Sequence, residues 1–264
     1  MASLSDVCTP RRAGDHYQLD VEPGWRMGRG AFGGLVVAAL TRAIEDATGD
    51  PSRKVRSVTA ELPGPVDHGT VEIAVDTLRR GNNVSTLRAA MSQNGEIKSH
   101  AVAVVAGART GGDTATWNDL DRPDAPAWTD IAPLAMHAVG PWPEFAQHFE
   151  YRLVDGNPGS GARRTLGWIR ARDPGPRHDA GYIAAMIDAW FPVAFVRLGA
   201  RPMATIAFTL DIAGGVDGLD PAAPLLYRAT APVCTDGYAL ETRELWSGDG
   251  RLVAINHQTF VIIR

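Results

Sequence analysis

The stretch Gly28-Arg-Gly-Ala-Phe-Gly-Gly-Leu-Val-Val-Ala-Ala-Leu-Thr-Arg-Ala-Ile44 predicts a glycine-rich turn that leads directly into a helix. Residues 35–44 are rich in Ala and Leu and contain no helix breaker. Their apolar character is almost continuous, which is typical of a helix that is buried on most of its surface. Residues 16–22 have a strand pattern, so we expect a strand immediately before this helix.

A series of strand patterns follows the predicted helix. They cover residues 55–66, 71–79 and 84–92. Asn94-Gly95 is the strongest hairpin signal in the chain, and it leads into a last strand at residues 96–106. The first part of the chain is therefore predicted to have the order strand, helix and then a meander of strands.

The second part of the chain repeats this order. Strand patterns at residues 149–154 and 165–172 precede a helical stretch at residues 180–198, which Pro192 is expected to break. Further strands are expected at residues 205–212, 225–232, 238–246 and 252–263. The turn Gly248-Asp-Gly250 occupies the place that Asn94-Gly95 has in the first part, which indicates an internal duplication.

The duplication predicts an α+β fold of two tandem units, each with a long helix packed on an antiparallel sheet. We expect the N-terminal unit at residues 1–110, a linker rich in Gly, Asp and Pro at residues 111–143, and the C-terminal unit at residues 144–264. Two sheets that meet edge to edge would also cover the strand edges of both units.

Composition is that of an ordinary globular protein. The chain has 264 residues, of which 45% are hydrophobic, and a net charge of -4, so neither nucleic acid nor an anionic membrane is an expected partner. No apolar run close to 18 residues and no leader segment are apparent, and we expect a cytoplasmic protein. Cys8 and Cys234 form neither a disulfide framework nor a metal set, and Cys8 is expected in a loose N-terminal segment.

Several segments resemble the acyl-CoA thioesterase II family. Arg29-Gly-Ala-Phe-Gly-Gly-Leu-Val-Val-Ala38 is similar to the segment in which an aromatic residue and two glycines open the first hotdog helix of that family. Asp188, Thr205 and Gln258 stand in the order and at the rough spacing of the family's catalytic Asp, Thr and Gln. The resemblance covers nearly the whole chain and implies a double hotdog acyl-CoA thioesterase.

Asp188 lies in the apolar run Ala184-Ala-Met-Ile-Asp-Ala-Trp-Phe-Pro192. An ionised carboxylate is costly to bury in such surroundings, and desolvation would raise its pKa toward that of a useful general base. The alternative is an Asp at a helix end that faces water or caps the segment after it.

Gln258 and two threonines are the polar candidates on the predicted strands. The Gln258 amide could hold a water molecule, or it could simply form a cross-strand hydrogen bond. Thr209 competes with Thr205 for the hydroxyl role, because this chain has Ala207-Phe-Thr209 where close relatives in the family carry Asp-His-Ser. Strict alternation would place Thr205 and Thr209 on the same strand face, and β-propensity alone could explain both.

Gly33 and Gly34 are expected to contribute to substrate binding with Thr209. Free N–H groups at the start of a helix can stabilise an oxyanion, and glycine lets a ligand approach the backbone closely. Tight packing of helix on sheet explains the same two glycines equally well.

These features predict the hydrolysis of acyl-CoA thioesters by a water molecule that Asp188 activates and that Thr205 and Gln258 position, with no metal or other cofactor. The apolar residues 35–40 and 186–191 favour a medium to long fatty acyl chain. A non-catalytic acyl-CoA binding protein and a hotdog enoyl-CoA hydratase are the alternatives, although Asp155-Gly-Asn-Pro-Gly159 lacks the His of the hydratase signature. Acyl-CoA is the expected partner, and a homo-oligomer is expected.

Overall fold

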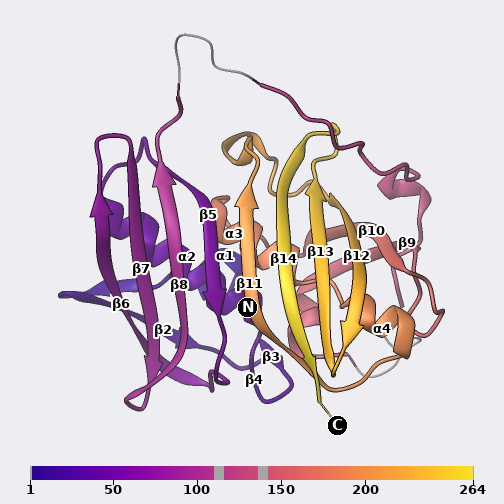
Figure 1. Ribbon diagram of the computed structural model, residues 1–264, viewed down its shortest axis with the longest axis horizontal. Coiled ribbons are helices and arrows are strands. Elements are labelled where there is room, and N and C mark those ends of the chain that lie inside the picture. The colour runs from indigo at the N-terminus through magenta and orange to yellow at the C-terminus, as the bar shows by residue number, and fades with distance from the viewer. Residues whose placement is uncertain (1, 110–115, 136–141, 264) are drawn as a thin grey trace.

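One large antiparallel sheet forms the framework of the molecule (Figure 1). The computed structural model describes residues 2–109, 116–135 and 142–263. Within them, the sheet has twelve strands in the order β1-β2-β6-β7-β8-β5-β11-β14-β13-β12-β10-β9. Its strands are β1 (Arg11–Ala13), β2 (His16–Val21), β5 (Lys54–Glu61), β6 (Gly69–Arg80), β7 (Val84–Gln93), β8 (Glu96–Ala106), β9 (Phe149–Asp155), β10 (Arg164–Ala171), β11 (Met203–Ile212), β12 (Leu225–Thr235), β13 (Tyr238–Trp246) and β14 (Leu252–Ile262).

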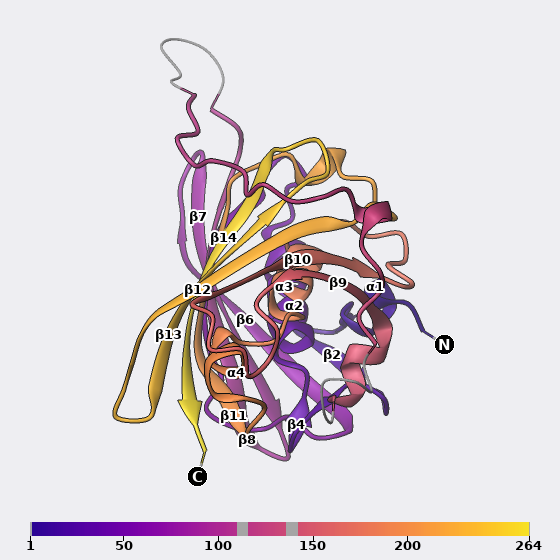
Figure 2. The same cartoon turned by 90° about the vertical axis from the view of Figure 1, so that its right-hand side faces the viewer.

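Two antiparallel helices fill the concave side of the curved sheet (Figure 2). They are α2 (Gly33–Thr48), which packs on β5 to β8, and α3 (Ala180–Asp188), which packs on β10 and β13. The remaining short elements are α1 (Leu4–Val7), α4 (Val193–Leu198), the ribbon of β3 (Arg26–Met27) and β4 (Gly30–Ala31), and the 3-10 turns η1 (Trp128–Asp130), η3 (Glu144–His148) and η4 (Val216–Gly218).

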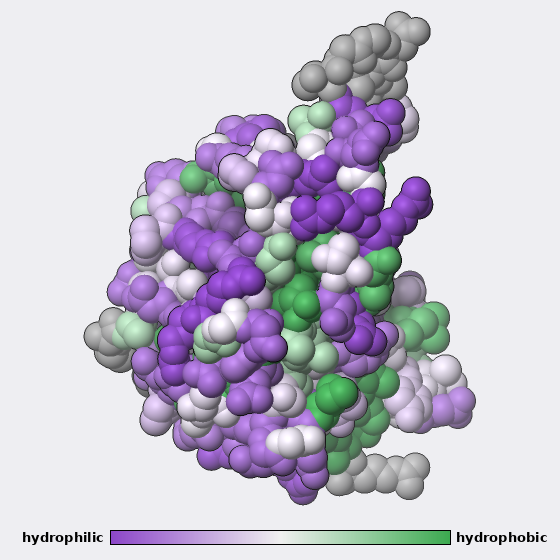
Figure 3. Space-filling model, turned by 90° about the vertical axis from the view of Figure 1, so that its left-hand side faces the viewer, coloured by the Kyte–Doolittle hydropathy of each residue, from purple (hydrophilic) through white to green (hydrophobic). Residues whose placement is uncertain are grey.

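The two halves of the sheet have the same strand order when each is followed outward from their junction. The N-terminal half runs β5, β8, β7, β6, β2, and the C-terminal half runs β11, β14, β13, β12, β10. The halves meet where β5 pairs with β11, with Thr59 opposite Thr209. The expected edge-to-edge contact of two sheets is therefore present. Strand β6 alternates between buried and exposed residues around Val71 and Ile73 and is fully exposed from Asp76 to Arg80. The side of the molecule seen in Figure 3 is mainly hydrophilic with a band of hydrophobic residues.

The predicted helix and strand positions agree with the structure apart from their ends. Helix α2 begins two residues before the predicted stretch and ends four residues after it, at Thr48. Its C-cap is Gly49, whose φ of 65° suits glycine. Strand β5 ends at Glu61 instead of continuing to residue 66, because Pro63 and Pro65 lack the N–H that a ladder needs. The break in the second helical stretch comes at Asp188, before Pro192.

The prediction of a loose N-terminal segment was wrong. Ser3 caps α1 with a capping box, and the backbone N–H groups of Leu4 and Ser5 donate to the carbonyls of Asp173 and Pro174. Cys8 is buried as a result, and burial raises the pKa of its thiol to about 12. A thiol in this state is a packing group.

The prediction that no apolar run approaches 18 residues was also wrong. Ala180–Leu198 spans 19 residues with a mean hydropathy of 1.3, which is long and apolar enough by length and composition to cross a membrane. In this fold 78% of that window is buried, and it supplies α3 and α4 to the core.

A buried arginine ties α2 to α3 and α1. The Arg42 side chain is 1% exposed, and its Nε lies 3.1 Å from both carboxylate oxygens of Asp179, the N-cap of α3. Its remaining nitrogens donate to the carbonyls of Ser5 and Arg177 and to the hydroxyl of Thr9. The guanidinium thus connects three separate segments.

Replacing this arginine with methionine should therefore destabilise the fold. Arg42→Met leaves Asp179 without its buried partner, and we expect a loss of about 3–5 kcal/mol in the free energy of unfolding, measured in urea. Arg11→Met is the matched control, because Arg11 and Asp20 form a pair with side chains 58% and 54% exposed. That change should cost about 0–1 kcal/mol. Equal losses in both variants would contradict the role of Arg42.

Candidate active site

Asp188 lies where the end of α3 meets the start of α2. A Cβ placed on Gly33 would be 3.0 Å from Oδ2 of Asp188, and one on Gly34 would be 3.0 Å from its Cβ. Phe32, the N-cap of α2, offers no side-chain cap, so N–H groups of the first turn remain free to face a carboxylate. The positive end of α2 thus compensates for an acid that stands at the negative end of α3.

The three residues predicted to be catalytic are brought together by a chain of hydrogen bonds. Thr205 Oγ1 donates to Oε1 of Gln258 over 3.0 Å, and Nε2 of Gln258 donates to Oδ1 of Asp188 over 2.8 Å. Gln258 is 3% exposed, and the Asp188 side chain is 9% exposed. The polar line therefore runs from a half-buried hydroxyl to a buried carboxylate.

Asn256 is a fourth member that sequence reasoning missed. Its Oδ1 accepts the second hydrogen of the Gln258 amide over 2.9 Å, and its Nδ2 donates to the carbonyl of Thr209 over 2.7 Å. Both amide hydrogens of Gln258 are then in use. In this arrangement Gln258 orients Asp188 and has no free donor for a water molecule. The position of Asn256, two residues before Gln258 on the same strand face, was the available signal.

The prediction that Thr205 and Thr209 share a strand face was wrong. A register shift between Thr205 and Ala207 in the β11–β14 ladder adds one residue to β11. Thr205 is then opposite Phe260 and faces the core with Gln258, while Thr209 is opposite the exposed His257. Residues directly opposite in an antiparallel pair share a face. Thr209 therefore points away from Asp188 and joins the site only through its carbonyl.

A buried ion pair on β13 completes the surroundings of Asp188, and it too was missed. Arg243 Nη1 donates to the carbonyl of Ile187 over 3.0 Å and lies 3.4 Å from Oδ1 of Asp188. Arg243 Nε donates over 2.8 Å to Glu241, whose other oxygen accepts the N–H of Val193 over 2.7 Å. Glu241 and Arg243 both lie on the core face of β13. The sequence alone does not show which face of that strand points inward, so it could not predict this pair.

Burial dominates the titration of the site. It raises the pKa of the Asp188 carboxyl above its usual 3.8, against the smaller lowering effects of Arg243, the Gln258 amide and the backbone N–H of Gly34. Gly34 thus serves Asp188 as a hydrogen-bond donor. Its lack of a Cβ is also a packing requirement, because a Cβ there would collide with the ring of Phe32.

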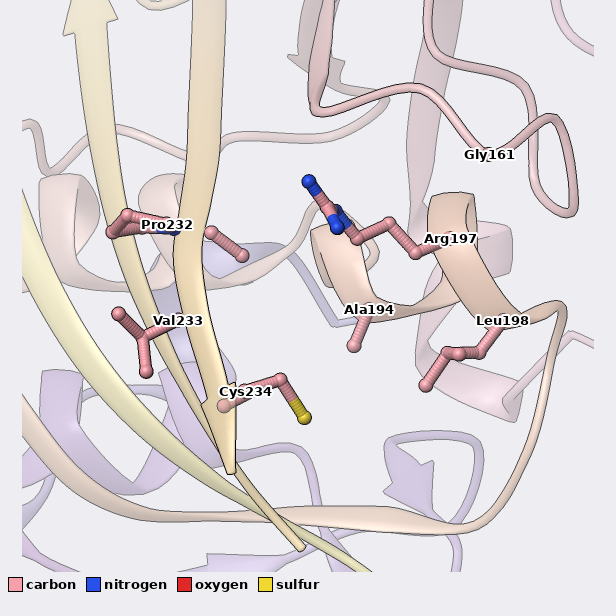
Figure 4. Close-up of a pocket in the computed structure, with 9 residues that line it drawn as sticks. Gly161, Ala194, Arg197, Leu198, Pro232, Val233 and Cys234 are labelled. Carbon is pink, nitrogen blue, oxygen red and sulfur yellow. The ribbon is translucent and has the colours of Figure 1, made fainter. Parts of the chain in front are cut away.

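A groove lies between α4 and the ends of β12 and β13. Its volume is about 590 Å³, a ligand-sized space. Leu198 and Arg197 extend from α4 toward the strand that carries Pro232, Val233 and Cys234 (Figure 4). Ala239 also lines it, and Ala239 is opposite Phe260, two residues along β14 from Gln258. The groove is therefore separated from the Asp188 cluster by the hydrophobic group around Phe260.

The apolar residues expected to line an acyl pocket fill the core instead. The side chains of α2 and of the α3 segment all belong to the main hydrophobic cluster, with exposures of 0–7% (Leu35, Val36, Val37, Ala38, Ala39, Leu40, Met186, Ile187, Trp190 and Phe191). Within the described part of the chain, no group of three or more His, Cys, Asp or Glu side chains is placed to hold a metal ion.

Two family models match most of the chain. Residues 21–110 match the acyl-CoA thioesterase N-terminal domain, and residues 119–262 match the acyl-CoA thioesterase C-terminal domain. No curated protein matches the sequence.

Solved structures of similar proteins show the hotdog fold. A conserved protein of unknown function with a hotdog fold from Alicyclobacillus acidocaldarius is 24% identical and has a TM-score of 0.86, covering 100% of this chain and 99% of its own. The acyl-CoA thioesterase II of Mycobacterium marinum is 19% identical with a TM-score of 0.78, covering 99% and 98%. The tesB protein of Mycobacterium avium subspecies paratuberculosis is 18% identical with a TM-score of 0.79, covering 99% and 98%.

The raised pKa of Asp188 predicts a contribution to stability that decreases as pH rises. Because the folded state holds this proton more tightly than the unfolded state, the stabilising contribution is complete below pH 3.8 and is lost as pH rises through the folded pKa. Asp188→Asn removes that loss, so the Tm of the variant minus the Tm of wild type should rise between about pH 4 and about pH 8.

Thermal melts across this range test the prediction, with Asp20→Asn as the control. Hydrogen bonds from Thr70 and Arg11 lower the pKa of Asp20, so its stabilising contribution is already complete above the unfolded pKa of 3.8 and is lost only at lower pH. The Tm difference for Asp20→Asn should therefore stay nearly constant across the same pH range. A difference for Asp188→Asn that does not depend on pH would contradict the raised pKa.

Proposed function

The chain belongs to the acyl-CoA thioesterase family and hydrolyses acyl-CoA thioesters, and from this premise we propose that Asp188 activates the attacking water molecule. The observation that supports this most is the line of hydrogen bonds from Thr205 through Gln258 to the buried Asp188 carboxylate. A carboxylate with a raised pKa and one fixed oxygen is suited to general base catalysis.

The proposed reaction is a direct hydrolysis. Asp188 takes a proton from water, and the oxygen of that water forms a bond to the thioester carbonyl carbon. The resulting tetrahedral intermediate then breaks its carbon–sulfur bond. The CoA thiolate leaves and receives the proton from Asp188, which regenerates the base and gives a free acid and a thiol.

Thr205 and Gln258 have different parts in this proposal. Gln258 fixes Oδ1 of Asp188, so Oδ2 is the oxygen assigned to the water. Thr205 donates its proton to Gln258, and its oxygen lone pairs are the acceptor assigned to the second hydrogen of that water. This division replaces the original hypothesis that the Gln258 amide binds the water itself.

The oxyanion of the intermediate is assigned to the start of α2. N–H groups at a helix start attract developing negative charge. Gly33 and Gly34 carry no side chain that would keep a thioester carbonyl from approaching them. Since the Gly34 N–H already donates to Asp188, the Gly33 N–H is the donor we assign to the oxyanion.

We also propose that the fold is a tandem double hotdog, with units at residues 1–110 and 144–264 joined by a linker at residues 111–143. The support is the shared strand order outward from the β5–β11 junction and the presence of one core helix, α2 or α3, in each half.

For the substrate, we propose a medium to long fatty acyl chain that runs past Phe260 toward the groove under α4. The core around α2 and α3 is already filled, so the chain needs other space. Apart from Arg197, the residues that line the groove carry no charge, and they include the apolar Ala194, Leu198 and Ala239. The groove is next to Phe260, which lies two residues after Gln258 on β14 and pairs with the lining residue Ala239.

Loss of the base should abolish most of the activity. Asp188→Asn keeps the shape of the side chain, and we expect kcat to fall by about 10²- to 10⁴-fold in an assay of free thiol release from acyl-CoA. Gln258→Ala should cost less, because Asp188 keeps its carboxylate. Hydrolysis at the wild-type rate by Asp188→Asn would refute the proposed base.

The two threonines provide a matched pair of controls for the same assay. Thr205→Val removes the hydroxyl that faces Gln258, and kcat should fall by about tenfold or more, which corresponds to about 1.4 kcal/mol. Thr209→Val changes the same group on the opposite strand face and should leave kcat near wild type. Equal effects would contradict the proposed division of roles.

The substrate proposal predicts a rising chain-length profile. Each buried methylene contributes about 0.8 kcal/mol, so kcat/KM should increase by about fourfold per carbon until the space ends. Cys234→Trp fills the groove from its lining and should move the optimum to shorter chains. Leu240→Trp, on the exposed face of the same hairpin, is the control and should leave the profile unchanged. A flat profile, or a preference for acetyl-CoA, would contradict a fatty acyl substrate.

A further inference from the structure

Arg243 is the charged group nearest to Asp188, and the mechanism above does not use it. Its side chain is 1% exposed, and Nη1 lies 3.4 Å from Oδ1 of Asp188. The guanidinium is also 5.2 Å from the centre of the Phe260 ring and 6.0 Å from that of Tyr227, so aromatic faces enclose it. Water therefore screens this charge little, and its field acts strongly on its neighbours.

The geometry of Arg243 is fixed on two sides. Glu241, with a side chain 0% exposed, accepts from Nε over 2.8 Å, and the N–H of Val193 holds the other oxygen of Glu241 over 2.7 Å. The carbonyl of Ile187 accepts from Nη1 over 3.0 Å, one residue before Asp188. The guanidinium thus binds the backbone of the last turn of α3 through Nη1 and is itself positioned by Glu241 through Nε.

The elements packed against Asp188 differ in whether they present titratable groups to it. Helix α2 presents the backbone of Gly33 and Gly34, and β14 presents the neutral amide of Gln258. The charged neighbours, Glu241 and Arg243, come from β13. The remaining titratable groups that the charge of Asp188 affects are Tyr151 on β9 and Tyr227 on β12. Burial keeps both tyrosines neutral by raising their pKa values well above 10.

Arg243 is therefore the one positive charge among these neighbours, and it stands against two buried carboxyl groups. A buried ion pair contributes little to stability compared with hydrophobic residues of the same volume. Arg243 instead contacts both the last backbone turn of α3 and the Asp188 carboxylate. A positive charge at this position favours the ionised form of Asp188, and the proposed base must be ionised before it can accept a proton.

We propose that Arg243 is a positioning residue for thioester hydrolysis: braced by Glu241, it holds the end of α3 in place and keeps Asp188 ionised, with Oδ1 turned inward and Oδ2 left for water. This inference rests on the proposed function, since it assigns Asp188 as the base. Arg243 itself has no contact with the reacting atoms in this assignment.

The pH dependence of kcat/KM tests the inference. A base acts when deprotonated, so activity rises with pH through the pKa of Asp188, and loss of a positive charge within 4 Å raises that pKa. Arg243→Met should move the acidic limb of the profile to higher pH by about 1–3 units. Arg243→Lys, which keeps the charge, should restore the limb to within about half a unit of wild type while kcat stays reduced, because lysine lacks the planar fork.

A second buried arginine separates this role from a purely structural one. Arg42→Met also removes a guanidinium with a side chain 1% exposed, but this one pairs with Asp179 at the start of α3, at the opposite end of that helix from Asp188. It should lower Tm and leave the acidic limb unmoved. If Arg243→Met behaves in the same way, Arg243 is structural and the inference is wrong. If Arg243→Met does not fold, Arg243→Gln carries the same test with a side chain that still hydrogen-bonds the Ile187 carbonyl.

Asp188→Asn, measured beside these variants, distinguishes a failure of the proposed role of Arg243 from a failure of the proposed function. An inactive Asp188→Asn with an unshifted Arg243→Met limb refutes the role of Arg243 and leaves the proposed function in place. An Asp188→Asn variant at the wild-type rate refutes the proposed function, whatever the profile of Arg243→Met. An inactive Asp188→Asn with an upward shift in Arg243→Met, reversed in Arg243→Lys, is the result expected from the inference.

Discussion

The burial of one carboxylate between two helix ends is the constraint on which the site depends. Asp188 closes α3, where the helix dipole is unfavourable to an acid, and faces the start of α2, where it is favourable. The two helices must therefore run antiparallel and close together, and Gly33 and Gly34 permit this approach because they carry no Cβ. Arg42 and Asp179 hold the opposite ends of the same helix pair. Contacts at both ends of the helix pair thus fix the position of the Asp188 carboxylate.

The site also requires both halves of the sheet. The start of α2 comes from the N-terminal half, whereas Asp188, Thr205 and Gln258 come from the C-terminal half. Pairing of β5 with β11 brings the halves together, and the β-bulge on β11 lies beside this seam, where the N–H of Leu62 donates to the carbonyl of Ile206. The bulge turns Thr205 inward. A single half would hold either the helix start or the polar residues.

The sequence was sufficient for features that depend on local chemistry. Apolar runs, the Asn94-Gly95 turn and the repeated order predicted the helices and most strands, and the resemblance predicted Asp188, Thr205 and Gln258. Features that depend on one extra residue or on the inward face of a strand were out of reach. Alternation placed Thr209 beside Thr205, and only the bulge separates them. Nothing local in the sequence distinguishes Arg243 and Glu241 from charges on the exposed face of a strand, and only the structure shows that β13 turns them inward.

The cluster around Asp188 is arranged at a cost to stability. Two carboxyl groups and one guanidinium are buried together, and the pKa values of both Asp188 and Glu241 are raised by that burial. Each desolvated charge that lacks a full partner opposes folding. The main hydrophobic cluster includes residues from both halves of the sheet and from α2 and α3, so the fold can carry this unfavourable region. Such an imbalance is typical of sites where a reactive group is kept ready, since selection for stability alone would replace the trio with hydrophobic side chains.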